Sequence, residues 1–121
     1  MGDPRHQLGI AAEAAVADHL EALGWQILAR RWRCSFGEID LACLDARGVL
    51  IGVEVRARRS SRAGSPVETV DRRRLHRLRS TLVEFTTRHA VLRRELRVDL
   101  AAVEFVNGEW RVTMHAAVDA W

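Results

Sequence analysis

The chain contains no lysine and no tyrosine, and only two cysteines and two prolines among its 121 residues. Two cysteines, Cys34 and Cys43, are too few for a disulfide-stabilised scaffold, and their separation does not match a zinc site. We therefore expect both to be reduced thiols in a cytoplasmic protein. No apolar run is long enough to cross a bilayer, and the N-terminus has no secretion signal. Neither membrane insertion nor export is predicted.

Because lysine is absent, arginine supplies all nineteen basic side chains, and the net charge is +3. Nine of these arginines fall between Arg56 and Arg79. An arginine cluster of this density fits a phosphate-binding surface, although a solvated helix face without any ligand has the same composition. The lack of tyrosine argues against a dedicated binder of single-stranded nucleic acid, which stacks bases on aromatic side chains.

The residues that are present predict one domain over residues 1–121, since 48% of them are apolar and the chain is too short for two cores. A first helix is predicted to begin at Asp3 and Pro4 and to end before Gly24. One face of this helix carries an apolar stripe, and Glu13 lies beside it, near the buried boundary. The stripe consists of Leu8, Ala12, Val16, Leu20 and Leu23.

A second helix is predicted to start at Ser65 and Pro66, where a serine cap, a proline and Glu68 form a helix-start signature. Strands are predicted at residues 25–32, 96–106 and 110–116, the last two joined by the turn Asn107-Gly108. With the hairpin described next, the order is αβββαββ, which predicts an α/β fold with a mixed five-stranded sheet flanked by helices. The apolar stripe of the second helix is Leu75, Leu78, Leu82 and Phe85.

Two charged segments, residues 37–40 and 53–56, are predicted to lie in the two strands of a β-hairpin. A three-residue loop, residues 46–48, puts Gly48 where a left-handed backbone is needed. Pairing then starts at Asp45 with Val49, and apolar residues face one another; a two-residue loop would set apolar residues against polar ones. The apolar pairs are Ile39 with Val55, Leu41 with Val53, and Cys43 with Ile51.

On the other face of this hairpin, Asp40 is predicted to lie opposite Glu54, and Glu38 opposite Arg56. Two carboxylates held together require a cation between them, or else one of them must stay protonated. A divalent metal is the simplest solution, and oxygen ligands favour Mg²⁺ or Mn²⁺ over zinc. The alternative is an ordinary solvent-exposed hairpin face on which Glu38 and Arg56 form an ion pair.

Several motifs spread along nearly the whole chain occur together in one family. They include Gly9-x-x-x-Glu13, Gly24-Trp25-x-Ile27-Leu28, Gly37-Glu38-Ile39-Asp40-Leu41, Val53-Glu54-Val55-Arg56, Gly64-x-Pro66-x-Glu68-x-Val70 and Arg97-Val98-Asp99. In this combination the chain resembles the YraN-like family of small bacterial proteins and, more distantly, the archaeal Holliday-junction resolvases. Both belong to the restriction-endonuclease-like, or PD-(D/E)xK, superfamily.

The resemblance implies a restriction-endonuclease-like core in which Asp40 and Glu54, often joined by Glu13, bind the metal. It implies a Mg²⁺- or Mn²⁺-dependent nuclease that hydrolyses phosphodiester bonds in branched or otherwise structured DNA, and it suggests a homodimer as in the resolvases. Arg56 stands where the superfamily has a catalytic lysine. An arginine keeps the positive charge beside the scissile phosphate but cannot act as a base.

The arginine therefore leaves a second interpretation open, a non-catalytic nucleic-acid-binding module on the same fold. A third is a protein-interaction adaptor whose arginines bind an acidic partner. For either nucleic-acid interpretation, the loop after the hairpin and the start of the second helix supply the candidate phosphate contacts. These contacts are Arg56, Arg58, Arg59, Arg62, Arg72 and Arg73, and the remaining candidate site residues are Glu38 and Asp99.

Overall fold

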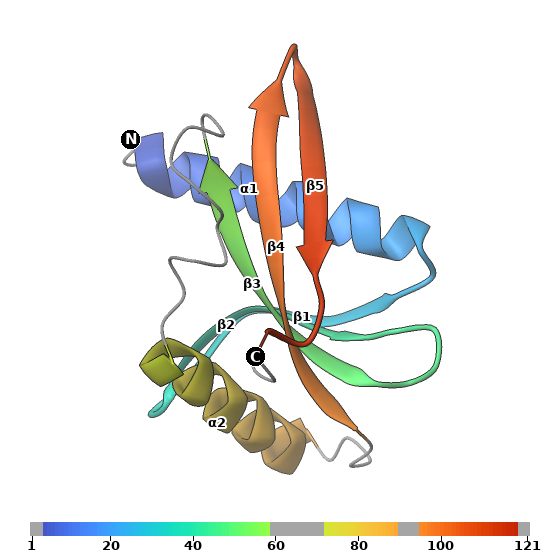
Figure 1. The fold of residues 1–121 in the computed structure, drawn as a ribbon. Coiled ribbons are helices and arrows are strands. Elements are labelled where there is room, and N and C mark those ends of the chain that lie inside the picture. The colour runs from blue at the N-terminus through green and yellow to red at the C-terminus, as the bar shows by residue number, and fades with distance from the viewer. Residues whose placement is uncertain (1–3, 59–71, 90–94, 119–121) are drawn as a thin grey trace.

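The computed structural model describes residues 4–58, 72–89 and 95–118. Its elements follow the predicted order αβββαββ (Figure 1). They are α1 (Pro4–Ala22), β1 (Gln26–Cys34), β2 (Gly37–Leu44), β3 (Leu50–Arg58), α2 (Arg72–His89), β4 (Leu96–Val106) and β5 (Glu109–His115). The predicted helix start at Ser65 and Pro66 lies outside the described residues, as do Arg59 and Arg62.

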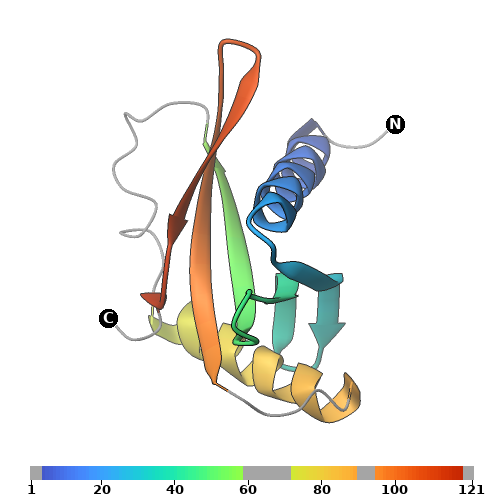
Figure 2. The ribbon, with the colours of Figure 1, turned by 90° about the vertical axis from the view of Figure 1, so that its right-hand side faces the viewer.

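The five strands form one sheet in the order β1-β2-β3-β4-β5. β3 and β4 pair in parallel, and the other three neighbouring pairs are antiparallel. A parallel pair requires a long crossover connection, and α2 lies in that connection. α1 packs on one face of the sheet and α2 on the other (Figure 2). The predicted α/β fold with a mixed five-stranded sheet and flanking helices is therefore confirmed.

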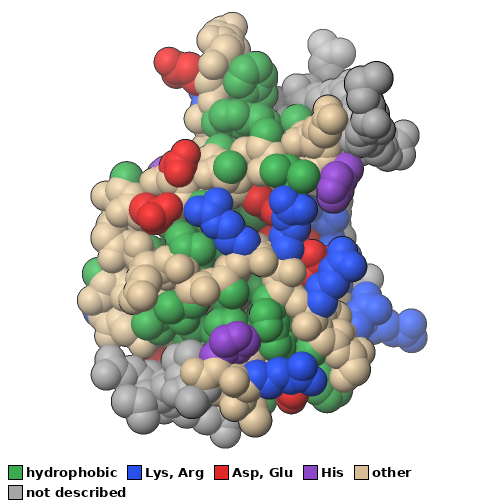
Figure 3. Space-filling view, turned by 180° about the vertical axis from the view of Figure 1, so that it is seen from behind, with side chains coloured by type: hydrophobic (Ala, Val, Ile, Leu, Met, Phe, Trp, Pro, Cys, Tyr) green, Lys and Arg blue, Asp and Glu red, His purple; other side chains and the backbone are tan. Residues whose placement is uncertain are grey.

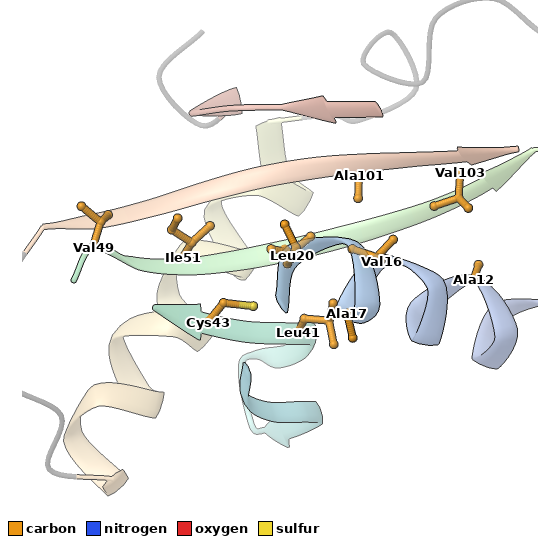
Figure 4. Close-up of a cluster of buried hydrophobic side chains, with 11 residues drawn as sticks. Ala12, Val16, Ala17, Leu20, Leu41, Cys43, Val49, Ile51, Ala101 and Val103 are labelled. Atoms are coloured by element: carbon orange, nitrogen blue, oxygen red, sulfur yellow. The ribbon is translucent and has the colours of Figure 1, made fainter. Parts of the chain in front are cut away.

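α1 buries its predicted stripe against β2, β3 and β4 (Figure 4). Ala12, Val16 and Leu20 have no exposed surface, but Leu23 is 56% exposed, so its assignment to the stripe was wrong. Leu23 lies beyond the last helical residue, where the chain turns away. Gly24 adopts φ +87° and donates its amide to the Glu21 carbonyl, the glycine-terminated helix end that the sequence predicted.

α2 packs its own stripe on the opposite face of the sheet. Leu78, Leu82 and Phe85 are 6%, 0% and 1% exposed, as predicted. The helix approaches β3 at Gly52, where an added Cβ would lie 3.5 Å from both terminal methyl groups of Leu82. This is an ordinary van der Waals distance, so α2 packs on β3 at Gly52 with room for a methyl group and no more.

The hairpin between β2 and β3 has the predicted loop and register. Gly48 adopts φ +84° and donates its amide to the Asp45 carbonyl at 3.0 Å, and the Asp45 amide donates to the Val49 carbonyl at 3.0 Å. Leu41 pairs with Val53, and Cys43 with Ile51. The predicted turn between β4 and β5 is also present, with φ +52° at Asn107 and φ +79° at Gly108.

Both cysteines are free thiols, as predicted, and Cys43 is buried in the core under α1. Burial raises the pKa of the Cys43 thiol to about 12, so it stays protonated and unreactive. Neither described helix carries an apolar stretch of the length that a bilayer crossing requires.

Candidate functional site

The strands β2 and β3 separate at Asp40. Their ladder ends at the pair Leu41 and Val53, so the predicted pair of Ile39 with Val55 does not form. In the alternating antiparallel pattern the amide of Val55 would meet the backbone carbonyl of Ile39. It donates instead to Oδ2 of the Asp40 side chain, at 2.8 Å. The carboxylate thus replaces a backbone acceptor at the point where the strands diverge.

The divergence moves Ile39 to the other face of the sheet. Ile39 is 1% exposed and packs with Leu82 and Phe85 of α2, whereas Leu41 packs under α1. The predicted continuous apolar face from Ile39 to Cys43 was therefore wrong at its first residue. The consequence for the site is that Asp40 lies where β2 changes the face on which its apolar side chains pack.

β1 is distorted beside the same point. It pairs Arg30 with Leu41 and Trp32 with Ile39, which places Arg31 across from Asp40. Arg31 adopts φ +48°, a left-handed conformation that costs a non-glycine residue about 1 kcal/mol or more. Its Nε atom lies 2.9 Å from Oε2 of Glu13 on α1. A strained arginine thus links α1 to the sheet directly beside the candidate site.

Asp40 lies in a field of negative charge. Burial and the charge of Glu54 raise the pKa of Asp40 to about 7, and the charges of Glu13 and Glu38 act in the same direction. The hydrogen bond from the Val55 amide opposes this rise because it stabilises the ionised form. The predicted cross-strand pair of Asp40 with Glu54 does not form, because the ladder ends at Leu41 and Val53, but the charge of Glu54 still acts on Asp40.

Glu54 is 4% exposed, and two arginines balance its charge. Nη2 of Arg74 donates to its Oε1 atom, and Nε of Arg56 lies 3.7 Å from the same oxygen. Arg74 was not among the predicted site residues. Its position four residues before Leu78, which was predicted to be buried, indicates that Arg74 lies on the sheet-facing side of α2.

Glu13 lies at the buried boundary of α1, as predicted, with 16% of its side chain exposed. Burial raises the pKa of its carboxyl group, and Arg31 opposes the rise. Because Arg31 holds Glu13 and arginines hold Glu54, the three predicted ligands do not converge. Among the described residues, no three His, Cys, Asp or Glu side chains are grouped so that they could hold a metal ion.

Asp40 and Glu54 by themselves fit a magnesium-type site. Mg²⁺ is usually held by one or two carboxylates and keeps several water ligands, so it does not require a third protein ligand. Both groups offer only oxygen, and a divalent ion would relieve the repulsion that raises the pKa of Asp40. The donor chemistry therefore supports these two residues as metal ligands, with Glu13 outside the set in this conformation.

Glu38 does not face Arg56, so the predicted cross-strand ion pair was wrong. Glu38 pairs with Arg33 of β1, and Arg33 Nε lies 3.3 Å from Glu38 Oε2. Arg56 turns toward Glu54, two residues before it on the same strand. Its Nε atom is buried and has no hydrogen-bond partner among the described residues. An unsatisfied buried donor of this kind is a position where an anionic oxygen would be stabilised.

Asp99 lies on the face of the sheet opposite to Glu54. The parallel register sets Asp99 beside Val53 and Leu100 beside Glu54, so the two carboxylates point away from each other. Asp99 is 1% exposed and accepts two hydrogen bonds from Arg97, at 2.8 and 3.0 Å. It also accepts the amide of Ala117 at 2.9 Å. The structure therefore gives Asp99 a role in holding the segment after β5.

Of the predicted phosphate contacts, Arg72 and Arg73 are exposed in the first turn of α2, and Arg56 is partly buried. Arg58 ends β3, but its side chain is not described. Arginine and acidic side chains lie side by side across the middle of the face seen from behind (Figure 3).

The comparisons with known proteins agree on one family. The model of the uncharacterised protein family UPF0102 matches residues 12–103. A UPF0102 protein of Renibacterium salmoninarum is 40% identical over 103 residues, which cover 85% of this chain and 86% of the relative. Another, of Anaeromyxobacter dehalogenans, is 40% identical over 111 residues, covering 92% and 82%. A third, of Deinococcus radiodurans, is 45% identical over 83 residues, covering 69% and 67%.

The matched range contains Glu13, Asp40, Glu54, Arg56 and Arg74, so every residue of the candidate site lies within it. This membership agrees with the family resemblance of the sequence motifs and is consistent with a restriction-endonuclease-like fold. The chain belongs to the UPF0102 family.

Proposed function

We propose that this protein is a metal-dependent nuclease that hydrolyses phosphodiester bonds in DNA. The observation that carries the proposal is the partly buried carboxyl group of Asp40, whose pKa is raised to about 7 by burial and by the charge of Glu54. Such a pair is costly for a fold unless a ligand uses it, and perturbed carboxyl groups of this kind cluster at functional sites.

Asp40 and Glu54 would hold Mg²⁺ or Mn²⁺. When bound, the ion would lower the pKa of a water molecule and balance negative charge at the phosphate. Glu13 is excluded from this pair in the present conformation by its contact with Arg31. Its contribution is to keep Arg31 and the distorted part of β1 in place beside Asp40.

Arg56 would bind the scissile phosphate. Its buried Nε atom lacks a partner among the described residues, and its guanidinium group remains charged at every physiological pH. It therefore orients the phosphate and stabilises charge, and the water must lose its proton to another acceptor. Arg72 and Arg73, exposed at the start of α2, would contact the DNA backbone further from the reacting group.

Branched or structured DNA is the proposed substrate, on the resemblance to resolvases alone, and a homodimer is proposed on the same ground. A DNA substrate together with two free thiols fits the cytoplasm. A second function, a nucleic-acid-binding module without catalysis, is favoured by one observation: arginines already satisfy Glu54 without a metal.

The deciding experiment is a cleavage assay on a four-way DNA junction and a linear duplex, with Mn²⁺ or Mg²⁺. It compares the natural chain with Asp40→Asn, Arg56→Lys and the control Asp18→Asn, which alters an exposed aspartate of α1. The nuclease is supported if the natural chain and Asp18→Asn cleave DNA and Asp40→Asn does not. If Arg56→Lys alone cleaves, the natural chain is a binding module whose site lost activity at this position. If neither the natural chain nor Arg56→Lys cleaves DNA although both bind it, the metal-dependent nuclease is ruled out.

A further inference from the structure

A hollow of about 220 Å³ lies between the β1–β2 turn and α2. The turn and the start of β2 contribute Phe36, Gly37 and Glu38, and α2 contributes Arg74, Arg77 and Leu78. Arg74 also donates to Glu54, so one wall of the hollow belongs to the candidate catalytic site. Whatever occupies the hollow therefore lies next to the carboxylates of that site.

The chemistry of the walls is that of a nucleotide site. Phe36 is 51% exposed, which is unusual for a large aromatic side chain on a turn and leaves ring surface available for stacking. Arg77 is exposed on α2 and offers a planar, permanently charged donor for a phosphate. Stacking of a base on an aromatic side chain, combined with arginine contacts to the backbone, is the common way in which proteins bind unpaired nucleotides.

We infer that this hollow binds one unpaired nucleotide of the DNA substrate, its base against Phe36 and its phosphate at Arg77. The inference rests on the proposed function and specifies the substrate: DNA that carries an unpaired nucleotide beside the scissile bond. A paired base cannot enter, because its faces are covered by its neighbours in the duplex. Entry therefore selects flaps, bulges and branched DNA with an unpaired nucleotide at the branch over continuous duplex.

Glu38 gives the hollow a base preference. Its carboxylate lines the hollow and is held from outside by Arg33. An ionised carboxylate only accepts hydrogen bonds, so it favours guanine, whose N1–H and exocyclic amino group can both donate to it. Thymine has no amino group and offers a single donor, its N3–H, so it is held less well in the hollow. Glu38→Ala removes this discrimination, and because the charge of Glu38 also acts on Asp40, the variant is judged by DNA binding and not by cleavage.

The test uses 2-aminopurine, whose fluorescence falls when it stacks, placed as the single unpaired nucleotide of a bulged duplex. Binding is measured in EDTA, so cleavage does not intervene, and a fully paired duplex of the same sequence is the reference. Phe36→Ala is expected to lose the quenching and to weaken bulge binding by about 5- to 20-fold, the effect of one lost stacking contact. Phe36→Tyr is expected to retain both.

Phe105→Ala is the matched control, because Phe105 is 53% exposed on β4, near the turn that joins β4 to β5. It is expected to leave quenching and affinity unchanged. Arg77→Gln is expected to weaken bulge binding, whereas Arg111→Gln, which alters an exposed arginine of β5, is not. A bulged guanine is expected to bind more tightly than a bulged thymine in the natural chain, and this difference is expected to be smaller in Glu38→Ala.

Equal binding of bulged and paired DNA, with no effect of Phe36→Ala, overturns the nucleotide site and leaves the proposed function standing. Failure to bind either DNA overturns the nucleotide site, whereas the proposed function is decided separately by the cleavage assay with metal. Quenching that persists in Phe36→Ala overturns the role of Phe36, because another group must then stack on the base. Loss of quenching in both Phe36→Ala and Phe105→Ala also contradicts the inference, since the effect would not be specific to the hollow.

Discussion

Arg74 of α2 donates a hydrogen bond to the same oxygen of Glu54, Oε1, that Arg56 approaches within the strand β3. Two cations therefore lie beside Oε1 of Glu54, one of the two proposed metal ligands. Because an ion and the two guanidinium groups carry charge of the same sign, they compete for this carboxylate. The contact between Arg74 and Glu54 keeps the site stable without metal and must loosen when metal binds.

The first prediction concerns Arg74→Gln. In EDTA this variant is expected to be less stable than the natural chain by about 1 kcal/mol, because Glu54 keeps only the weaker contact with Arg56. The stabilisation by Mn²⁺ is expected to be larger than in the natural chain, since the ion no longer displaces an arginine. Thermal unfolding with and without Mn²⁺ measures both effects.

Arg88→Gln is the control for this variant. It breaks the ion pair of Arg88 with Glu84, also on α2, in which Arg88 Nε lies 3.0 Å from Glu84 Oε1. An exposed pair of this kind contributes at most a few tenths of a kcal/mol and has no connection to the site. If Arg74→Gln and Arg88→Gln respond to Mn²⁺ alike, Arg74 does not compete with the metal.

The second prediction is the pH dependence of stability. The pKa of Asp40 is about 7 in the folded chain against 3.8 ordinarily, so between these values the folded state holds a proton that the unfolded state has lost. Stability must therefore fall as pH rises from 4 to 7, by an amount on the order of a few kcal/mol. Asp40→Asn removes the titrating group while its side-chain oxygen still accepts the Val55 amide.

Urea unfolding at pH 5 and pH 8 is the measurement. We expect Asp40→Asn to be more stable than the natural chain, by a clearly larger margin at pH 8 than at pH 5. Asp18→Asn, an exposed change on α1, should follow the natural chain at both pH values. Parallel pH profiles of the natural chain and Asp40→Asn would show that Asp40 ionises normally in the folded protein.

The third prediction is that metal binding strengthens with pH. A metal ion must displace the proton that Asp40 holds below its pKa of about 7. The apparent affinity for Mg²⁺ or Mn²⁺ is therefore expected to fall about tenfold for each pH unit below 7 and to level off above it. Titrations of the metal-induced thermal shift at pH 6, 7 and 8 give the slope, and EDTA should reverse the shift. A shift of equal size in Asp40→Asn would assign the metal to other residues.

Several features of the fold could be predicted because they depend on local sequence. The hairpin around Gly48 and the turn at Asn107-Gly108 follow from short-range backbone preferences. The stripe that includes Leu82 follows from helical periodicity. The pairing of Leu41 with Val53 follows from the alternation of apolar residues in two neighbouring strands. Each of these patterns depends on residues that are close together in the sequence.

The details of the site could not be predicted in the same way, because they depend on elements that meet only after folding. The transfer of Ile39 to the face of α2 follows from the Asp40 side chain taking the Val55 amide. The arginine at Glu54 comes from α2, twenty residues further along the chain. Glu38 was assigned to Arg56 because only β3 was considered as its partner strand, whereas β1 lies on its other side.

The fourth prediction separates Asp99 from Asp40 and Glu54, the two proposed metal ligands. Asp99→Ala leaves the amide of Ala117 and the Arg97 guanidinium, whose side chain is 23% exposed, without their acceptor. The expected loss is about 2–4 kcal/mol in the free energy of urea unfolding, because the remaining partners keep their desolvation cost. Arg97→Ala should cost a similar amount by leaving Asp99 unpaired, and the double variant should cost less than the sum of the two.

The Mn²⁺-induced stabilisation of Asp99→Ala should equal that of the natural chain, since Asp99 and Glu54 occupy opposite faces of the sheet. A variant that stays stable but no longer responds to Mn²⁺ would instead place Asp99 among the metal ligands.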